Sequence, residues 1–333
     1  PGPADAAGAG IHFLDLVSGQ TLWRGGSVTG ATKVFSNMNW SMDRAFATEI
    51  RVADLNGDRF ADRMYAADMG GQIWRFDIVN GSAPAALVDG GVIAQLGAEG
   101  LGSPTASDTR RFYNSPDISV FRDPLQGRRY ISIAIGSGYR AHPFDVSAAD
   151  RFYSLRDPNV FGRLDQTAYD NYSIITEADL VEVGGSVKSV VAANESGWKF
   201  TLPNNEKVLA DSVTFNNEIF FVTFDPRAVG AVNCGTGQGT NFLYRVSVVN
   251  GDPIVTNLDA ITSGDEDKER RRQLAQGGIA PTPTVLFPSP VDPVNCTGAA
   301  CSPPPVMCVG VECDSPGFRN IPKRTLWTQD GIE

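Results

Sequence analysis

Residues 54–77 decide how the rest of the sequence is interpreted: they read DLNGDRFAD and then RMYAADMGGQIWRFD. Oxygen-bearing side chains stand at positions 1, 3, 5 and 9 of this stretch, and position 7 can offer its backbone carbonyl. This spacing matches the first three-quarters of an EF-hand calcium loop. Calcium is a hard cation that takes several oxygens at about 2.3–2.6 Å. The sequence therefore predicts a Ca2+ site within residues 54–62.

Two positions of the loop depart from the EF-hand pattern. Position 6 is Arg59, where glycine normally makes the sharp turn, and position 12 is Tyr65 rather than a bidentate glutamate. Residues 49–53 and 63–67 have the composition of strands, so the loop is predicted to close a β-hairpin. A plain Asn-Gly-Asp turn and a site for another divalent ion are the alternatives. Three alternating carboxylates would repel one another without a cation, which favours calcium.

Strand patterns on both sides of this hairpin indicate an all-β chain. Gly 35, Pro 21 and 20% charged residues point to short strands joined by tight turns. Segment 73–81 is echoed without a gap by segment 243–251, which begins 170 residues later (243 − 73). That offset suits about four units of the ~40–45 residues that a propeller blade contains. Further strand runs are expected at residues 11–23, 117–121, 129–136, 197–202, 207–215 and 218–225.

We therefore predict an all-β fold built as an irregular β-propeller of short four-stranded sheets, with a pair of β-sandwiches as the alternative. Residues 1–276 would hold the blades and the calcium loop. Residues 277–333 would form a Pro/Cys-rich strap and closing segment of the same domain. Short helical inserts are expected at 176–181 and 263–276.

Charge and hydropathy limit the partners. The net charge of −10 argues against nucleic acid, because phosphate binding needs clustered Lys and Arg. The basic run 270–272 follows the acidic run 265–269 and is expected to start a solvated helix of mixed charge. No apolar run reaches the ~18–20 residues that cross a bilayer, so we expect no transmembrane segment. The first residues carry neither an initiator Met nor a signal peptide, so we expect a fragment or a processed product.

Five cysteines are unevenly distributed. One stands alone and four crowd the Pro-rich tail: Cys234, then Cys296, Cys301, Cys308 and Cys313. The C-x4-C spacing in the tail is not the C-x2-C spacing of a zinc ribbon, so disulfides are favoured over a metal. Disulfides would indicate an oxidising, extracytoplasmic compartment. The pairing itself stays open.

Catalytic motifs are scarce. The histidines are His12 and His142, and both are expected to be structural, since the chain has no serine-hydrolase elbow, P-loop or His-Glu-x-x-His motif. A non-enzymatic protein is therefore expected. A quinoprotein dehydrogenase is the enzymatic alternative, because its calcium-dependent propeller repeats also carry Asp-x-x-x-Gly and Trp, as at Asp15, Gly19 and Trp23. Against it, such enzymes are longer, and the vicinal cysteine pair that they often show is missing.

The residues now assembled resemble a family. The loop at 54–62, running into residues 65–68 and 72–77, looks like the C-terminal β-propeller domain of bacterial type IV pilus tip-associated biogenesis factors and adhesins. Weaker matches lie at residues 136–143, 197–198, 207–210 and 239–246. Together they span about residues 10–250, and the Cys-rich tail does not map onto the pattern.

The resemblance implies a seven-bladed, irregular propeller at the pilus tip or cell surface. It implies that the calcium loop helps to control pilus extension against retraction, and hence twitching motility and attachment. The implied ligands are Asp54, Asn56, Asp58, Asp62 and the backbone carbonyl of Phe60. Minor pilins or other pilus-tip components would be the partners, and surface binding would belong to an N-terminal region outside this sequence. A purely structural cap with an incidental metal is a further alternative.

Overall fold

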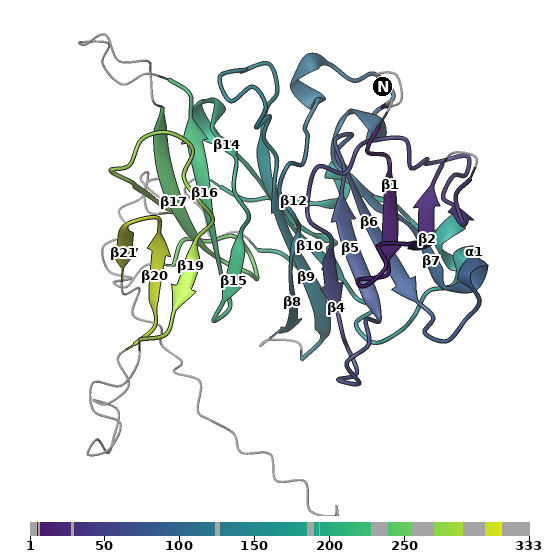
Figure 1. Cartoon of the computed structure of the whole chain (residues 1–333). Helices are drawn as coiled ribbons and strands as arrows, with labels where there is room; N and C mark the ends of the chain where they lie inside the picture. The colour runs from purple at the N-terminus through teal and green to yellow at the C-terminus, as the bar shows by residue number, and fades with distance from the viewer. Residues whose placement is uncertain are drawn as a thin grey trace, which may run out of the picture.

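Strands supply nearly all of the regular structure. The computed structural model describes residues 5, 7–27, 30–123, 127–184, 190–192, 194–227, 239–254, 270–288 and 304–314. Within these ranges the single α-helix is α1 (Gln166–Asp170), and short 3-10 turns cover 84–86, 98–100, 106–108, 177–179 and 203–205. The strands form separate sheets that lie side by side in chain order across the molecule (Figure 1). The predicted all-β class is confirmed.

The sheets are built from neighbouring strands of the sequence. The first sheet has the order β1-β2-β3: β1 (Gly10–Leu14), β2 (Thr21–Gly26) and β3 (Lys33–Val34). The second sheet has the order β11-β7-β6-β5-β4: β4 (Arg51–Ala53), β5 (Arg63–Ala67), β6 (Gln72–Ile78), β7 (Val88–Gln95) and β11 (Ile175–Thr176). The third sheet has the order β12-β13-β10-β9-β8: β8 (Asp117–Arg122), β9 (Arg129–Gly136), β10 (Arg151–Asp157), β12 (Val181–Glu182) and β13 (Gly197–Thr201).

Two sheets complete the described part of the chain. The fourth has the order β14-β16-β17-β18, with β15 also paired to β16: β14 (Lys207–Val208), β15 (Val213–Phe215), β16 (Glu218–Asp225), β17 (Thr240–Ser247) and β18 (Arg271–Gln273). The fifth has the order β19-β20-β21: β19 (Thr284–Leu286), β20 (Val306–Val309) and β21 (Glu312–Asp314). The fifth sheet contributes Met307 and Val309 to a core cluster shared with β16 and β17.

The internal echo of the sequence has a structural counterpart. Its two copies, residues 73–81 and 243–251, begin in β6 and β17, each of which pairs antiparallel with the strand directly before it in the chain. One sheet lies between them among the described residues, so the 170-residue offset (243 − 73) covers two sheets of the described structure. The repeat unit here is longer than the ~40–45 residues of a typical blade. Blade number and ring closure remain predictions.

Two local expectations are wrong. The run 270–272 was expected to start a solvated helix, but Arg271–Gln273 is strand β18, paired with β17, and Arg270 is 1% exposed. Pairing with the open edge of β17 gives this segment backbone hydrogen bonds, and this tertiary contact outweighs the weak helical preference of a charged segment. The remainder of the expected 263–276 helix, residues 263–269, lies outside the described residues. At 176–181 the chain forms a 3-10 turn between β11 and β12 instead of an α-helix.

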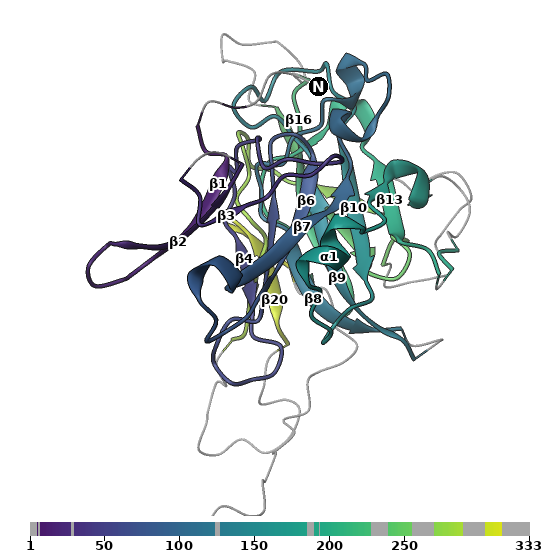
Figure 2. The same ribbon diagram turned by 90° about the vertical axis from the view of Figure 1, so that its right-hand side faces the viewer.

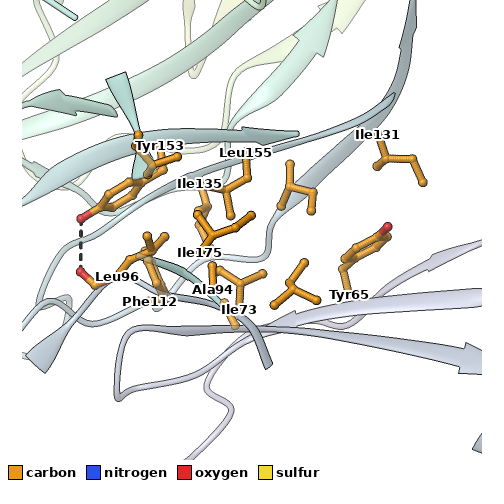
Figure 3. Close-up of a cluster of buried hydrophobic side chains, with 14 of the residues drawn as sticks. Tyr65, Ile73, Ala94, Leu96, Phe112, Ile131, Ile135, Tyr153, Leu155 and Ile175 are labelled. Carbon is orange, nitrogen blue, oxygen red and sulfur yellow. Dashed lines mark hydrogen bonds between the residues drawn. The ribbon is translucent and has the colours of Figure 1, made fainter. Parts of the chain in front are cut away.

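The second and third sheets share one hydrophobic core (Figure 3). The second sheet and its edge strand contribute Tyr65, Ile73, Ala94 and Ile175, and the third contributes Ile131, Ile135, Tyr153 and Leu155. Burying each large apolar side chain contributes about 1.5–3 kcal/mol. After β10 the chain crosses back to pair with β7 as β11, and it then returns to the third sheet as β12. This crossover ties the two sheets together.

A buried ion-pair network lies between the same two sheets. Arg75 donates to Asp157 Oδ2 at 2.8 Å and to Asp77 Oδ2 at 2.9 Å, and Arg63 Nε donates to Asp77 Oδ1 at 2.7 Å. All four side chains are at most 2% exposed. The hydroxyl of Tyr65 donates to Asp157 at 2.6 Å. The two positive and two negative side chains cancel in charge, so no buried charge is left without an opposite partner.

Breaking this network should destabilise the whole domain. We expect Asp157→Ala to lower the free energy of unfolding by about 3–5 kcal/mol, because the network would then hold two buried arginine charges against the single carboxylate of Asp77. Urea unfolding followed by tryptophan fluorescence measures the loss. The control is Asp314→Ala, which breaks a pair with Arg272 that is 43% and 49% exposed and should cost less than about 1 kcal/mol. Similar losses in the two variants would contradict this account.

Candidate metal centre

The predicted calcium loop connects two paired strands, as expected. Ala53 at the end of β4 faces Arg63 at the start of β5, so residues 54–62 close an antiparallel hairpin. The loop is anchored at its end: Asp62 N donates to Ala53 O at 2.9 Å, and Ile78 N at the end of β6 donates to Asp62 O at 2.8 Å. Asp62 therefore has a fixed backbone, while the middle of the loop is exposed.

The acidic side chains of the loop organise its backbone. Asp54 accepts from Gly57 N at 2.7 Å and from Arg59 N at 2.8 Å. The Arg59 N–H is the main reason why the pKa of Asp54 lies below its usual value, against an opposing effect of burial. Asp58 Oδ1 accepts from Phe60 N at 2.8 Å. These contacts are the Asx turns by which Asp and Asn shape tight loops.

Three of the predicted side-chain ligands gather around one point. The Asn56 amide nitrogen lies 3.0 Å from Asp58 Oδ2 and 3.3 Å from Asp62 Oδ1. A positively polarised group thus stands between two carboxylates. Asp54 points to the loop N–H groups instead, and Phe60 exposes 64% of its surface. Across the described residues, no three His, Cys, Asp or Glu side chains lie close enough together to form a metal cluster.

Arg59 makes the turn that glycine makes in an EF-hand. Its φ is +75°, in the left-handed region, and Gly57 two residues earlier has φ +82°. A residue with a Cβ costs about 1–2 kcal/mol in this conformation. Position 6 of the loop is therefore left-handed, the conformation for which glycine is normally used, although the sequence has arginine there.

The strain at this position can be tested by two substitutions that both remove the arginine charge. We expect Arg59→Gly to be more stable than Arg59→Ala by about 1 kcal/mol, because only glycine adopts a positive φ without steric cost. The glycine's larger unfolded-state entropy reduces the difference. Urea midpoints of the two variants make the comparison. An alanine variant as stable as the glycine variant would contradict the turn described here.

Arg63, the residue directly after the loop, reaches across to the third sheet. Its guanidinium donates to the carbonyls of Asn159 at 2.6 Å, Val160 at 3.0 Å and Gly162 at 2.7 Å. It is 1% exposed and also pairs with Asp77. The end of the loop is therefore tied to the segment that follows β10. The sequence analysis missed this contact because nothing in residues 158–162 marks them as partners of an arginine 96 residues earlier.

Asp68, also within the stretch that opened the sequence analysis, is a structural carboxylate. It is fully buried and accepts from Trp74 Nε1 at 2.8 Å, Gly70 N at 2.9 Å and Gln72 N at 3.0 Å. Burial raises the pKa of Asp68 to about 7, although these N–H groups favour the charged form. In the unfolded chain the pKa is near 3.9.

This pKa difference makes stability depend on pH. The folded state holds the proton of Asp68 up to about pH 7, whereas the unfolded state releases it near pH 3.9. The contribution of Asp68 to stability therefore falls as pH rises between these values, by up to about 4 kcal/mol. The uncharged Asp68→Asn variant lacks this dependence. Urea unfolding of both proteins at pH 5 and pH 8 measures this effect. The free energy of unfolding of the wild type, relative to that of Asp68→Asn, should be lower at pH 8 than at pH 5. The same relative value at both pH values would contradict the raised pKa of Asp68.

The remaining motifs have structural roles. Asp15 accepts from Ser18 N at 2.6 Å, Gly19 has φ +71°, and Trp23 is buried, so the Asp-x-x-x-Gly pattern forms a hairpin turn beside a core tryptophan. Cys308 and Cys313 form a disulfide that joins β20 and β21. The predicted preference for disulfides is confirmed for this pair. Cys234, Cys296 and Cys301 lie outside the described residues, as do the other residues of 289–303 and 315–333.

Comparisons with known proteins find matches among the type IV pilus proteins that the sequence motifs resemble. No protein-family model matches this sequence. A type IV pilus biogenesis factor PilY1 homolog of Xylella fastidiosa is 23% identical over 281 residues, which cover 74% of this chain and 17% of that protein. The chain therefore spans less than a fifth of the length of this curated relative. The crystal structure of the Pseudomonas aeruginosa PilY1 C-terminal domain matches with a TM-score of 0.54 and 13% identity, over 93% of this chain and 67% of that one.

These two matches confirm the resemblance that the motifs indicated. The structural match establishes similarity of fold, and the sequence match is to a protein named as a type IV pilus biogenesis factor. Among the described residues no helix is long and apolar enough to cross a membrane. Neither match bears on the metal ligands, so these remain predictions.

Proposed function

We propose that this chain is a calcium-binding, non-enzymatic module of a type IV pilus biogenesis factor. The observation that carries the metal proposal is the convergence of Asn56, Asp58 and Asp62 within 3.0–3.3 Å in the loop between β4 and β5. The Asn56 amide nitrogen now stands between the two carboxylates, and its Oδ1 accepts from Asp58 N at 2.8 Å. Once this amide turns its Oδ1 inward, every donor would be oxygen, as Ca2+ prefers. The pilus assignment is supported by the two relatives.

Calcium would be held by the five groups that the EF-hand spacing selects: Asp54, Asn56, Asp58, the carbonyl of Phe60 and Asp62. Binding requires Asp54 to exchange its loop N–H partners for the cation. Because no glutamate occupies position 12, water would complete the coordination, and the affinity is expected to be micromolar or weaker on the EF-hand scale.

The effect of calcium would pass through Arg63. The cation neutralises three carboxylates in the loop and so removes their repulsion. Asp62 is then held more firmly, and the next residue fixes the segment 158–162 of the neighbouring sheet. We propose that the ordered end of the two sheets contacts minor pilins or other pilus-tip components, and that calcium thereby regulates extension, retraction, twitching and attachment. An extracytoplasmic location agrees with the Cys308–Cys313 disulfide.

Calorimetric titration of calcium tests the metal site. We expect saturable binding to the wild-type chain, weak competition by magnesium, and loss of binding in Asp54→Ala. The matched control is Asp145→Ala, which removes another Asx-turn aspartate, one that accepts from Ser147 N outside the loop, and should bind calcium normally. Wild-type affinity in Asp54→Ala would disprove the ligand assignment, and no binding in the wild type would leave the loop as a plain turn.

The regulatory proposal needs a separate test in cells. In a piliated bacterium that depends on the full-length protein, we expect Asp54→Ala to change twitching and surface piliation while the protein level stays normal. A structural cap with an incidental metal predicts no change in either property. Unchanged twitching, combined with lost calcium binding in vitro, would therefore reject regulation and retain the metal site.

A further inference from the structure

A basic groove runs along the end of the third sheet where β8 turns into β9. Two adjoining hollows of about 510 and 650 Å³ share Arg129, Pro158 and Asn159 in their walls. The β4–β5 loop lies at the lower end of the sheets in Figure 1, as do the end of β8 and the start of β9, and Figure 2 shows the same end from the side. Residues 158–162 in the wall are those whose carbonyls Arg63 holds.

Three arginines at the groove repel one another. Arg122 and Arg129 stand directly opposite each other in the β8–β9 pairing, and Arg128 is next in sequence. All three are exposed, and their side chains form no ion pair or hydrogen bond within the described part of the chain. Like charges placed directly opposite across two strands destabilise a sheet. An arrangement of this kind points to a ligand that offsets the charge.

A fourth arginine adds charge beneath the groove. Arg156 is 7% exposed and donates to the backbone carbonyls of Ala192 at 2.7 Å and Val249 at 2.8 Å. It pairs with no carboxylate among the described residues, and its Nε–H is buried without a hydrogen-bond partner. Buried charges are normally paired. The carboxylate in the groove lining is Glu195, so four arginines face one acid.

The neutral lining suits an extended chain. Asn159 and Asn194 offer amides that can bond to a peptide backbone, while Tyr172 and the 64%-exposed ring of Phe161 offer apolar contact. Burial raises the pKa of Tyr130 to about 12, so its hydroxyl stays neutral and adds no negative charge at the groove. The groove thus combines positive charge with polar and aromatic surface.

We propose that this groove binds an acidic peptide segment of a partner protein. Arginine guanidinium groups bind carboxylates with two parallel hydrogen bonds, which gives both strength and orientation. The net charge of −10 would repel a dense polyanion such as nucleic acid at long range, whereas a short run of Asp or Glu side chains engages the local positive field. This proposal does not depend on calcium binding.

The test uses a fluorescein-labelled hexaglutamate peptide as probe and measures fluorescence anisotropy with the purified chain at low salt. We expect saturable binding that weakens as salt rises, because the contacts are charge pairs near the surface. The double variant Arg128→Gln/Arg129→Gln should bind at least tenfold more weakly. Arg129→Lys keeps the positive charge but lacks the paired N–H donors of the guanidinium, so its loss of affinity for the probe should be intermediate. Hexaglutamine should not bind.

The control for overall charge is Arg227→Gln, since Arg227 is 56% exposed and lies outside the groove lining. It should bind the probe within about twofold of the wild type. Equal losses in this control and in the double variant would overturn the proposal in favour of non-specific attraction. No binding of hexaglutamate at low salt, or binding of anionic lipid vesicles with none of the peptide, would also overturn it. Thermal unfolding of each variant confirms that these exposed substitutions leave the fold intact.

Discussion

The buried charge network of Arg63, Arg75, Asp77 and Asp157 is the constraint on which the described structure depends. Removing one member would leave a charge in the interior, where desolvation is not compensated. The network also fixes geometry, because the arginine fork demands a definite position for each carboxylate. β5, β6 and the end of β10 are therefore held in one relation, and the apolar core packs beside that frame.

Arg63, a member of this network, also connects the two candidate sites. On one side it follows Asp62, the last predicted ligand of the loop, and on the other it holds the carbonyls of Asn159 and Gly162. The candidate cation site and the basic groove therefore share one structural support. Arg63 is 1% exposed, so the end of the loop and the groove wall meet at one buried side chain.

The sequence predicted what depends on local pattern. Alternation and turn residues located the hairpins around 54–62 and 123–128, and β9, which is buried from residue 130 to residue 136, agrees with its apolar run. It failed where distant segments decide the outcome. Arg271–Gln273 is a strand because the edge of β17 is available, and Arg63 is a core residue because Asp77 and three carbonyls surround it. No pattern in the neighbouring sequence predicts either environment.

The two candidate sites carry opposite charges on a protein that is acidic overall. The loop concentrates carboxylates at 54–62, whereas the groove concentrates arginines at 122–129 and 156, on the same end of the sheets. Opposite charges at one end of the sheets favour a partner that presents the complementary arrangement and disfavour partners of uniform charge. Neutralising the loop with a cation would lower the local negative potential next to the groove. An acidic segment would then approach this end with less repulsion, so the two sites could act in concert without any change in the sheets themselves.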